Sequence, residues 1–312
     1  MIFQLLKLSV NGYPNKPGIK VVKVAITYFG LAIRNLGNVQ KLAFPEVVNQ
    51  SDVWASYSKW LRFQLKYINK KDWARTPLIR DVSLVHTEPL FGKDFCMNRD
   101  DKNMILTCAE KLAQEFRGIP KEKFSNWLER YLILMQSFKE LSISPIEDEI
   151  VICEIGPGFG PVMALTSKKK MKYLSFDTFE MQEVNRHVIE SITSSPTNYE
   201  YHPTNLDESK TPLNAHHLPY CVIAIYSLTE LEKSEREMFL NLVKKAEYSL
   251  IACNENFNGL NNFAYIENLA ESLNLSFTFK TMESIYGDAI PRYTKKHRLY
   301  LVGPKLKNPL ID

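Results

Sequence analysis

Three glycines at alternate positions form the motif best able to hold a ligand. The stretch VICEIGPGFGP, residues 151–161, places Gly156, Gly158 and Gly160 directly after an apolar run, and Glu154 stands two residues before the first glycine. Glycines permit a tight turn and let a ligand approach the backbone, and a helix that follows offers free N–H groups to an anion. An ordinary tight turn also uses glycines, so a second position must decide between the two interpretations.

An acidic residue after the next apolar run supports the binding role. Asp177 ends the run YLSFD, 17 residues after Gly160. A carboxylate at a strand tip can accept hydrogen bonds from both hydroxyls of a ribose, whereas its alternative role is to cap the helix that follows. Together the glycine loop and Asp177 predict a site for a nucleoside-containing cofactor, and NAD and S-adenosylmethionine are the two main candidates.

Alternating strand and helix patterns supply the framework that must position these motifs. Near-continuous apolar runs predict strands buried on both faces, and the helical stretches between them predict right-handed crossovers and a parallel sheet. We therefore expect a doubly wound α/β domain. The expected strands are 149–155, 172–176, 220–226, 248–253, 275–280 and 298–303, and the expected helices are 180–193, 232–246 and 261–273.

The glycine spacing discriminates between the two cofactors. NAD sites usually carry GxGxxG, whereas E-x-G-x-G-x-G resembles the first motif of class I S-adenosylmethionine-dependent methyltransferases. The resemblance extends to the order of elements over residues 146–304, and it implies a seven-stranded Rossmann-like sheet whose last strand, 298–303, is antiparallel to the rest. The cofactor-binding residues that it implies are Glu154, Gly156, Gly158 and Gly160 at the methionine part, Asp177 at the ribose, and Asn205 or Asp207 at the adenine.

The first half of the chain is mainly helical and its beginning is strongly basic. Apolar residues recur at helical spacing over 100–117 and 121–141, so we expect an N-terminal helical domain, 1–145, before the cofactor-binding domain, 146–312. Residues 1–80 hold 13 Lys and Arg against 3 Asp and Glu, a charge of +10, while the rest of the chain carries −6. This segment either contacts an anionic surface, of a membrane or a nucleic acid, or is a helical cap with solvated lysines.

Methyl transfer to a hydroxyl requires a positioned acceptor and usually a general base. Groups at the carboxyl ends of the later strands are the candidates, namely Glu230, Glu255 and His297, with the alternatives that Glu230 is only a helix-terminal charge and that His297 only bonds backbone. Because the last strand is antiparallel, the loop before it should open on the same edge. That loop contains Tyr286, Asp288, Arg292 and Tyr293, and His86 could reach the site from a lid.

No metal site is expected. We expect Asp100 and Asp101 to serve only as a helix start, and the adjacent His216 and His217 lack a chelating spacing. The five cysteines include three inside apolar runs, Cys153, Cys221 and Cys253, which predicts buried thiols and a reducing, cytoplasmic location.

The expected activity is O-methylation of a sugar hydroxyl in a glycan or lipid-linked glycan. It is implied by a resemblance of the helical N-terminus and of YSLTELEKSEREMFLNLV to bacterial sugar O-methyltransferases of polysaccharide gene clusters. Residues 1–80 would then attach the protein to the anionic inner face of the membrane. A nucleic-acid methyltransferase is the alternative, but SLTEL stands where an amino-group methylase carries an Asn/Asp-Pro-Pro-Tyr/Phe motif. A non-catalytic partner that keeps the cofactor site is the third alternative.

Overall fold

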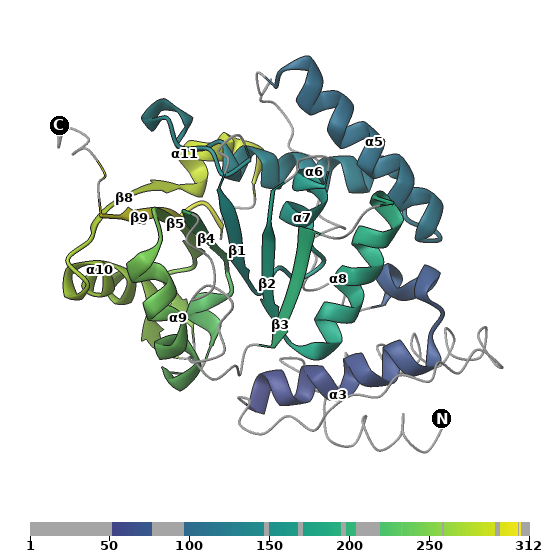
Figure 1. Cartoon of the computed structure of the whole chain (residues 1–312), viewed down its shortest axis with the longest axis horizontal. Coiled ribbons are helices and arrows are strands. Elements are labelled where there is room, and N and C mark those ends of the chain that lie inside the picture. Colours follow the sequence, from purple (N-terminus) through teal and green to yellow (C-terminus); the bar gives the residue numbers. More distant parts are fainter. Residues whose placement is uncertain are drawn as a thin grey trace.

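The computed structural model describes residues 52–76, 97–146, 150–167, 171–194, 198–203, 219–231, 233–257, 259–290, 294–304 and 306. Its centre is a seven-stranded sheet in the order β3-β2-β1-β4-β5-β9-β8 (Figure 1). The strands are β1 (Val151–Ile155), β2 (Tyr173–Asp177), β3 (Tyr199–Pro203), β4 (Tyr220–Ile225), β5 (Tyr248–Cys253), β8 (Ser276–Thr281) and β9 (Arg298–Gly303). The predicted seven-stranded Rossmann-like fold is therefore confirmed.

The direction of the strands also agrees with the prediction. β1 to β5 pair in parallel, and β9 pairs antiparallel with both β5 and β8. Because β9 runs against the others, the loop that leads into it lies at the carboxyl edge of the parallel strands. A two-stranded ribbon, β6 (Asn256–Phe257) and β7 (Leu260–Asn261), follows β5.

Helices cover both faces of the sheet, and alternate strand residues supply the two cores. Ile152 and Ile223 point to the face covered by α7 (Pro161–Thr166) and α8 (Phe179–Ile192). Val151 and Val222 belong to the opposite core, with α9 (Lys233–Lys245) and α10 (Asn262–Ser272). Figure 1 shows α9 and α10 to the left of the central strands and α8 to the right.

The described N-terminal helices add a layer to the α7 and α8 face. They are α3 (Asp52–Tyr67), the 3₁₀ turn η1 (Lys70–Arg75), α5 (Arg99–Glu115), α6 (Lys121–Met135) and the 3₁₀ turn η2 (Lys139–Leu141). Leu112 of α5 and Trp127 of α6 are fully buried in the same hydrophobic core as Val162 of α7. Asn98 caps α5 by accepting the N–H of Asp101 at 2.7 Å, so the acidic pair does start this helix.

The structure tests the expectation for the cysteines but not the one for most of the basic segment. Cys153, Cys221 and Cys253 are free and buried in β1, β4 and β5, as predicted. Most of the basic segment, and His86, lie outside the described residues, and the division of the chain at residue 145 stays a prediction. None of the helices described is both long and apolar enough to cross a membrane.

Candidate active site

The glycine loop joins the carboxyl end of β1 to α7. Gly156, Gly158 and Gly160 have φ angles of 61°, 59° and 81°, all in the left-handed region that residues with a side chain adopt only at a cost. The motif therefore reflects three backbone conformations that depend on glycine. Phe159, between the last two glycines, is fully buried, and its ring centroid lies 5.1 Å from that of Phe116, directly after α5, and 5.5 Å from that of Trp127 of α6.

Gly156 is required for a second reason, which is the approach of the chain after β4. A Cβ on Gly156 would lie 2.5 Å from the Cβ of Ser227, closer than side chains tolerate. The Ser227 hydroxyl donates a hydrogen bond to the carbonyl of Ile155. The loops after β1 and β4 are thus packed against each other at this edge, a role of Ser227 that no local sequence pattern indicates.

The peptide of Gly158 is held from both sides. Its N–H donates to the carboxylate of Asp177, and its carbonyl accepts the side-chain N–H of Asn185 at 2.6 Å. Asn185 is fully buried on α8. Sequence reasoning missed this residue, although an amide on the apolar stripe that includes Met181 and Val188 was the available signal.

Asp177 is positioned at the tip of β2, beside the glycine loop. Its carboxylate accepts the N–H of Thr178 at 2.7 Å as well as that of Gly158. The helix cap that was the alternative role for Asp177 belongs to Thr178, whose hydroxyl accepts the N–H of Met181. Burial raises the pKa of Asp177 to about 7 despite these hydrogen bonds.

Glu154 is the second buried acid of the loop. It is 1% exposed on β1, and its Oε2 atom has no hydrogen-bond partner within the described structure. Burial, and next the charge of Asp177, raise the pKa of Glu154 well above its usual value. A buried carboxyl left in this state is costly, and a cation or an N–H donor from a ligand would relieve the cost.

Aromatic and imidazole groups gather next to these acids. The hydroxyl of Tyr226, directly after β4, lies 3.2 Å from Nδ1 of His297, which directly precedes β9. Tyr131 of α6 interacts electrostatically with both Glu154 and Tyr226, and Tyr286 of α11 (Met282–Tyr286) interacts with Tyr226 and Tyr131. We call Tyr131, Tyr226, Tyr286 and His297 the tyrosine–histidine cluster.

The two carboxylate base candidates lie in different surroundings. Glu230 ends the 3₁₀ turn η6 (Leu228–Glu230) and is half-buried, and burial alone raises its pKa to about 7. Glu255 follows β5 and is exposed, with its backbone carbonyl accepting the N–H of Asn262 at 2.7 Å. The structure therefore places Glu230 and His297 in partly buried surroundings, whereas Glu255 is exposed to solvent.

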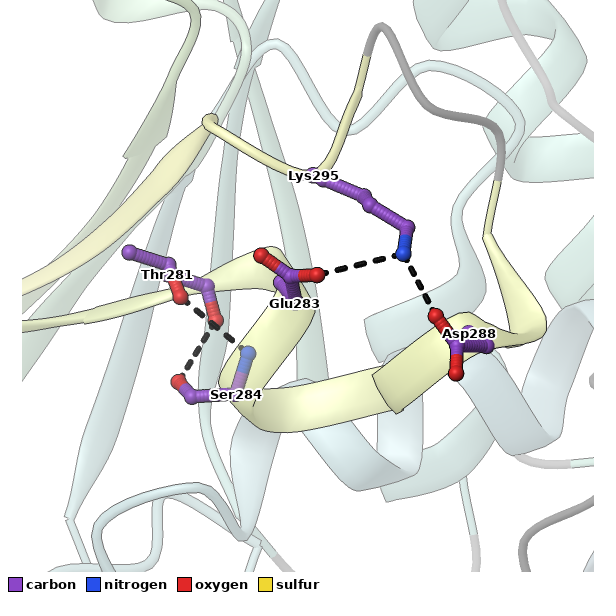
Figure 2. A network of polar contacts seen from close by, with 5 residues as sticks. All are labelled: Thr281, Glu283, Ser284, Asp288 and Lys295. Carbon is purple, nitrogen blue, oxygen red and sulfur yellow. Dashed lines mark hydrogen bonds and ion pairs between the residues drawn. The ribbon is translucent and has the colours of Figure 1, made fainter.

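The loop between β8 and β9 is braced by charged contacts (Figure 2). Lys295 lies 2.5 Å from the carboxylate of Asp288 and 3.1 Å from that of Glu283, and Thr281 caps α11 by accepting the N–H of Ser284 at 3.1 Å. The Asp288 side chain is 96% exposed. Asp288 thus lies in an exposed ion pair, whereas Tyr286, predicted for the same loop, is buried and donates its hydroxyl to the carbonyl of Arg130 at 2.7 Å.

The predicted site residues Asn205, Asp207, Arg292 and Tyr293 lie outside the described residues, as do His216 and His217, for which no metal site was expected. β3 ends at Pro203, which pairs with Asp177, so the chain leaves this strand at the edge where Asp177 stands. In the ranges that the structure describes, no three His, Cys, Asp or Glu side chains gather as a metal site would require.

Comparisons with solved structures find proteins that resemble this chain at low sequence identity. No family model and no curated protein matches the sequence. A SAM-dependent methyltransferase from Aquifex aeolicus is 16% identical, with a TM-score of 0.39 over 56% of this chain and 95% of that chain. An O-methyltransferase family protein from Burkholderia thailandensis is 11% identical, with a TM-score of 0.41 over 98% of this chain and 99% of that chain. We draw no functional conclusion from likenesses this remote.

The close approach at Gly156 gives a prediction for stability. Gly156→Ala should lower the free energy of unfolding by about 1–3 kcal/mol for the forced contact and about 1–2 kcal/mol for the left-handed backbone. Ser227→Gly in the same chain removes the opposing Cβ and should recover part of this loss. A double-mutant cycle by urea unfolding measures the coupling. A coupling energy of zero would contradict the contact between the two loops.

The raised pKa of Glu154 gives a prediction for pH dependence. A carboxyl whose pKa is raised by folding contributes stability that is complete below about pH 4.5 and is lost as the pH rises towards the folded value. Glu154→Gln cannot ionise, so its stability relative to wild type should increase from pH 5 to pH 8, by up to about 1.4 kcal/mol per pH unit. Urea unfolding at several pH values tests this without any ligand.

The matched control for this measurement is Glu271→Gln, which makes the same change at an exposed position of α10. Its stability should follow the wild-type pH curve. Parallel stability curves for wild type and Glu154→Gln would show that folding does not raise the pKa of Glu154.

Proposed function

We propose that this protein is an S-adenosylmethionine-dependent methyltransferase. The observation that carries the proposal is the clamped glycine loop: Gly158 is fixed between Asp177 and Asn185, so the Asp177 carboxylate stands beside the loop at the carboxyl edge of the sheet. Ligands of open α/β sheets bind at this edge, where the strand order reverses between β1 and β4.

The charges of the site favour S-adenosylmethionine over a dinucleotide. Two buried carboxyls, Glu154 and Asp177, border the loop, and they would repel the pyrophosphate of NAD. The helix after the loop also begins at Pro161, which has no N–H to offer an anion. S-adenosylmethionine instead carries an ammonium group and a sulfonium group, and a cation beside Glu154 would favour its ionised form.

The residues of the chain fit the parts of this cofactor. Asp177 would hold the ribose hydroxyls, its carboxylate being already oriented by the N–H groups of Gly158 and Thr178. The Oε2 atom of Glu154 has no protein partner in the described structure and would accept an N–H of the methionine part. When bound, the cofactor supplies an electrophilic methyl group, and the protein supplies position and a route for the acceptor's proton.

For the acceptor we propose a sugar hydroxyl in a glycan or a lipid-linked glycan. Tyr226, which is only partly buried, offers an apolar ring with a polar tip, a combination suited to the mixed surface of a sugar. A hydroxyl is a poor nucleophile near neutral pH, and Glu230 and His297 are the groups near this edge that could lead its proton away. Attachment of residues 1–80 to an anionic membrane would bring the protein to a lipid-linked acceptor.

The raised pKa of Asp177 predicts how cofactor affinity changes with pH. If the ionised carboxylate takes the ribose, affinity should increase about tenfold from pH 6 to pH 8, because the pKa of the free protein lies near 7. Asp177→Asn should lose about 1–3 kcal/mol of binding free energy and most of this pH dependence. Titration calorimetry measures both effects, with the exposed Asp100→Asn of α5 as the matched control. Failure of the wild type to bind S-adenosylmethionine at any of these pH values would refute the cofactor.

Labelled methyl transfer tests the acceptor class. Glycan, lipid and RNA fractions from cells that lack this protein are incubated with the purified chain and S-adenosylmethionine carrying a tritiated methyl group. We expect label in the glycan or glycolipid fraction, released as a methyl sugar by acid hydrolysis. Label confined to RNA would instead identify a nucleic-acid methyltransferase.

A further inference from the structure

Tyr226 occupies an unusual backbone conformation at the carboxyl edge of the sheet. Its φ angle is 59°, which for a bulky residue costs on the order of 1–3 kcal/mol. The other non-glycine residues with positive φ in the described structure are Ser142 and Asn274, which stand at the ends of helices. Tyr226 instead follows β4 directly, and the next residue, Ser227, lies against the glycine loop.

The surrounding structure holds Tyr226 in this conformation. Its N–H donates to the carbonyl of Ala252 in β5 at 2.9 Å, and the next residue, Ser227, packs against Gly156. The side chain is therefore aimed by the sheet and by the glycine loop together. Strain of this kind, imposed by two fixed neighbours, is more often found at functional positions than elsewhere.

His297 is brought to Tyr226 by the antiparallel strand. The backbone of His297 is fixed by hydrogen bonds from its N–H to Thr294, at 3.0 Å, and from the N–H of Met282 to its carbonyl, at 2.8 Å. Its ring stands edge-on to that of Tyr226, with 5.5 Å between centroids, and Nδ1 is 3.2 Å from the tyrosine hydroxyl. Burial lowers the pKa of His297, so the imidazole is neutral at pH 7 and one ring nitrogen is free to accept a proton.

Two further tyrosines lie within electrostatic range of this pair. The pKa of Tyr131 on α6 is raised by burial first, then by the charge of Glu154 and by Tyr226. The pKa of Tyr286 on α11 is raised by burial first and then by Tyr226, against the opposing charge of Arg130. Tyr226 therefore lies within electrostatic reach of groups that border Glu154.

We propose that Tyr226 and His297 form the relay that removes the proton of the acceptor hydroxyl, an inference that rests on the proposed methyl transfer. The acceptor oxygen forms a bond to the methyl carbon, and the carbon–sulfur bond breaks with its electron pair staying on sulfur. The acceptor O–H bond breaks as its proton passes to the Tyr226 oxygen. The Tyr226 proton passes to Nδ1 of His297, and the resulting imidazolium later releases a proton to water.

Glu230 is the competing base, and its surroundings separate it from this pair. Burial is the cause of its raised pKa, and Glu230 lies on the turn η6, after the residue that packs against the glycine loop. Tyr226, by contrast, contacts His297 directly and adjoins the glycine loop through Ser227. The geometry thus assigns the acceptor's proton to the tyrosine and histidine pair.

Four variants test the relay in the tritium assay. The acceptor is the glycan or glycolipid fraction that the wild-type protein labels, and S-adenosylmethionine is saturating. Tyr226→Phe, His297→Ala and His297→Gln should each lower incorporation by about 10²- to 10⁴-fold, and the Tyr226→Phe, His297→Gln double variant should fall no further. His297→Gln still accepts a hydrogen bond from Tyr226 but cannot take its proton, which separates chemistry from folding. In wild type, incorporation should fall at acid pH as His297 becomes protonated.

The matched control is Tyr220→Phe, at the opposite end of β4. Tyr220 is the first residue of β4, whereas Tyr226 follows its last residue. The Tyr220 hydroxyl donates a hydrogen bond to the carbonyl of Leu242 at 3.0 Å. This variant loses the same atom and a buried hydrogen bond, and should keep full incorporation. S-adenosylmethionine affinity, measured by calorimetry, should be unchanged in Tyr220→Phe and in the four relay variants.

A spectroscopic measurement tests the relay without any acceptor. Nitrogen chemical shifts of His297 in isotope-labelled protein should show Nδ1 without a proton at pH 7.5, because Nδ1 accepts from Tyr226, and this state should weaken in Tyr226→Phe. A protonated Nδ1 in the wild type would reverse the direction of the relay and overturn it.

The outcomes distinguish the relay from the activity on which it rests. Absence of S-adenosylmethionine binding by the wild type defeats the proposed function and the relay together. Normal cofactor binding with wild-type incorporation by Tyr226→Phe defeats the relay alone. If Glu230→Gln then abolishes incorporation, the base is Glu230.

Discussion

The burial of Glu154 and Asp177 beside one glycine loop is the constraint on which the rest of this edge depends. Each carboxyl is almost inaccessible to water, and burial raises both pKa values. Removing two acids from water is expensive unless hydrogen bonds or charges compensate. Asp177 receives backbone N–H groups from Thr178 and Gly158, whereas one oxygen of Glu154 receives none from the described residues. A hydrogen-bond donor or a cation beside Glu154 would therefore stabilise the folded protein.

The helices before the sheet create the conditions for that burial. Phe159 of the glycine loop inserts among Phe116, Phe124 and Trp127, all fully buried on α5, α6 and the turn between them. This packing holds the glycine loop against the helices α5 and α6. Tyr131 extends the same helix α6 towards Glu154. The described N-terminal helices therefore form part of the site's wall as well as a cover for the sheet.

The sequence allowed the sheet and the ligand loop to be predicted because their signals are local. Apolar runs mark β1, β2, β4, β5 and β9, and the glycine spacing marks three left-handed residues. β3 was missed because YEYHP, at the sheet edge, mixes aromatic and polar residues that are only partly buried. Asn185, Ser227 and the contact of Tyr226 with His297 were missed for another reason. They act through contacts between segments 27 to 72 residues apart, which no local pattern encodes.

A third buried acid shows how the chain separates structural from ligand-facing charge. Glu180, in the first turn of α8, is fully buried, and the guanidinium of Arg62 on α3 lies 2.5 Å from its carboxylate. The charge of Glu180 also contributes to the raised pKa of Asp177. The N-terminal helix α3 thus supplies an arginine to one acid of this edge, while Glu154 and Asp177 have no such ion pair in the described structure. A positively charged side chain beside Glu154 or Asp177 would compete with a cationic ligand. Because neither acid has such a partner in the described structure, this edge of the sheet suits a cationic ligand. The same arrangement makes the empty site less stable as the pH rises, so binding of a cationic cofactor and stabilisation of the fold should be coupled.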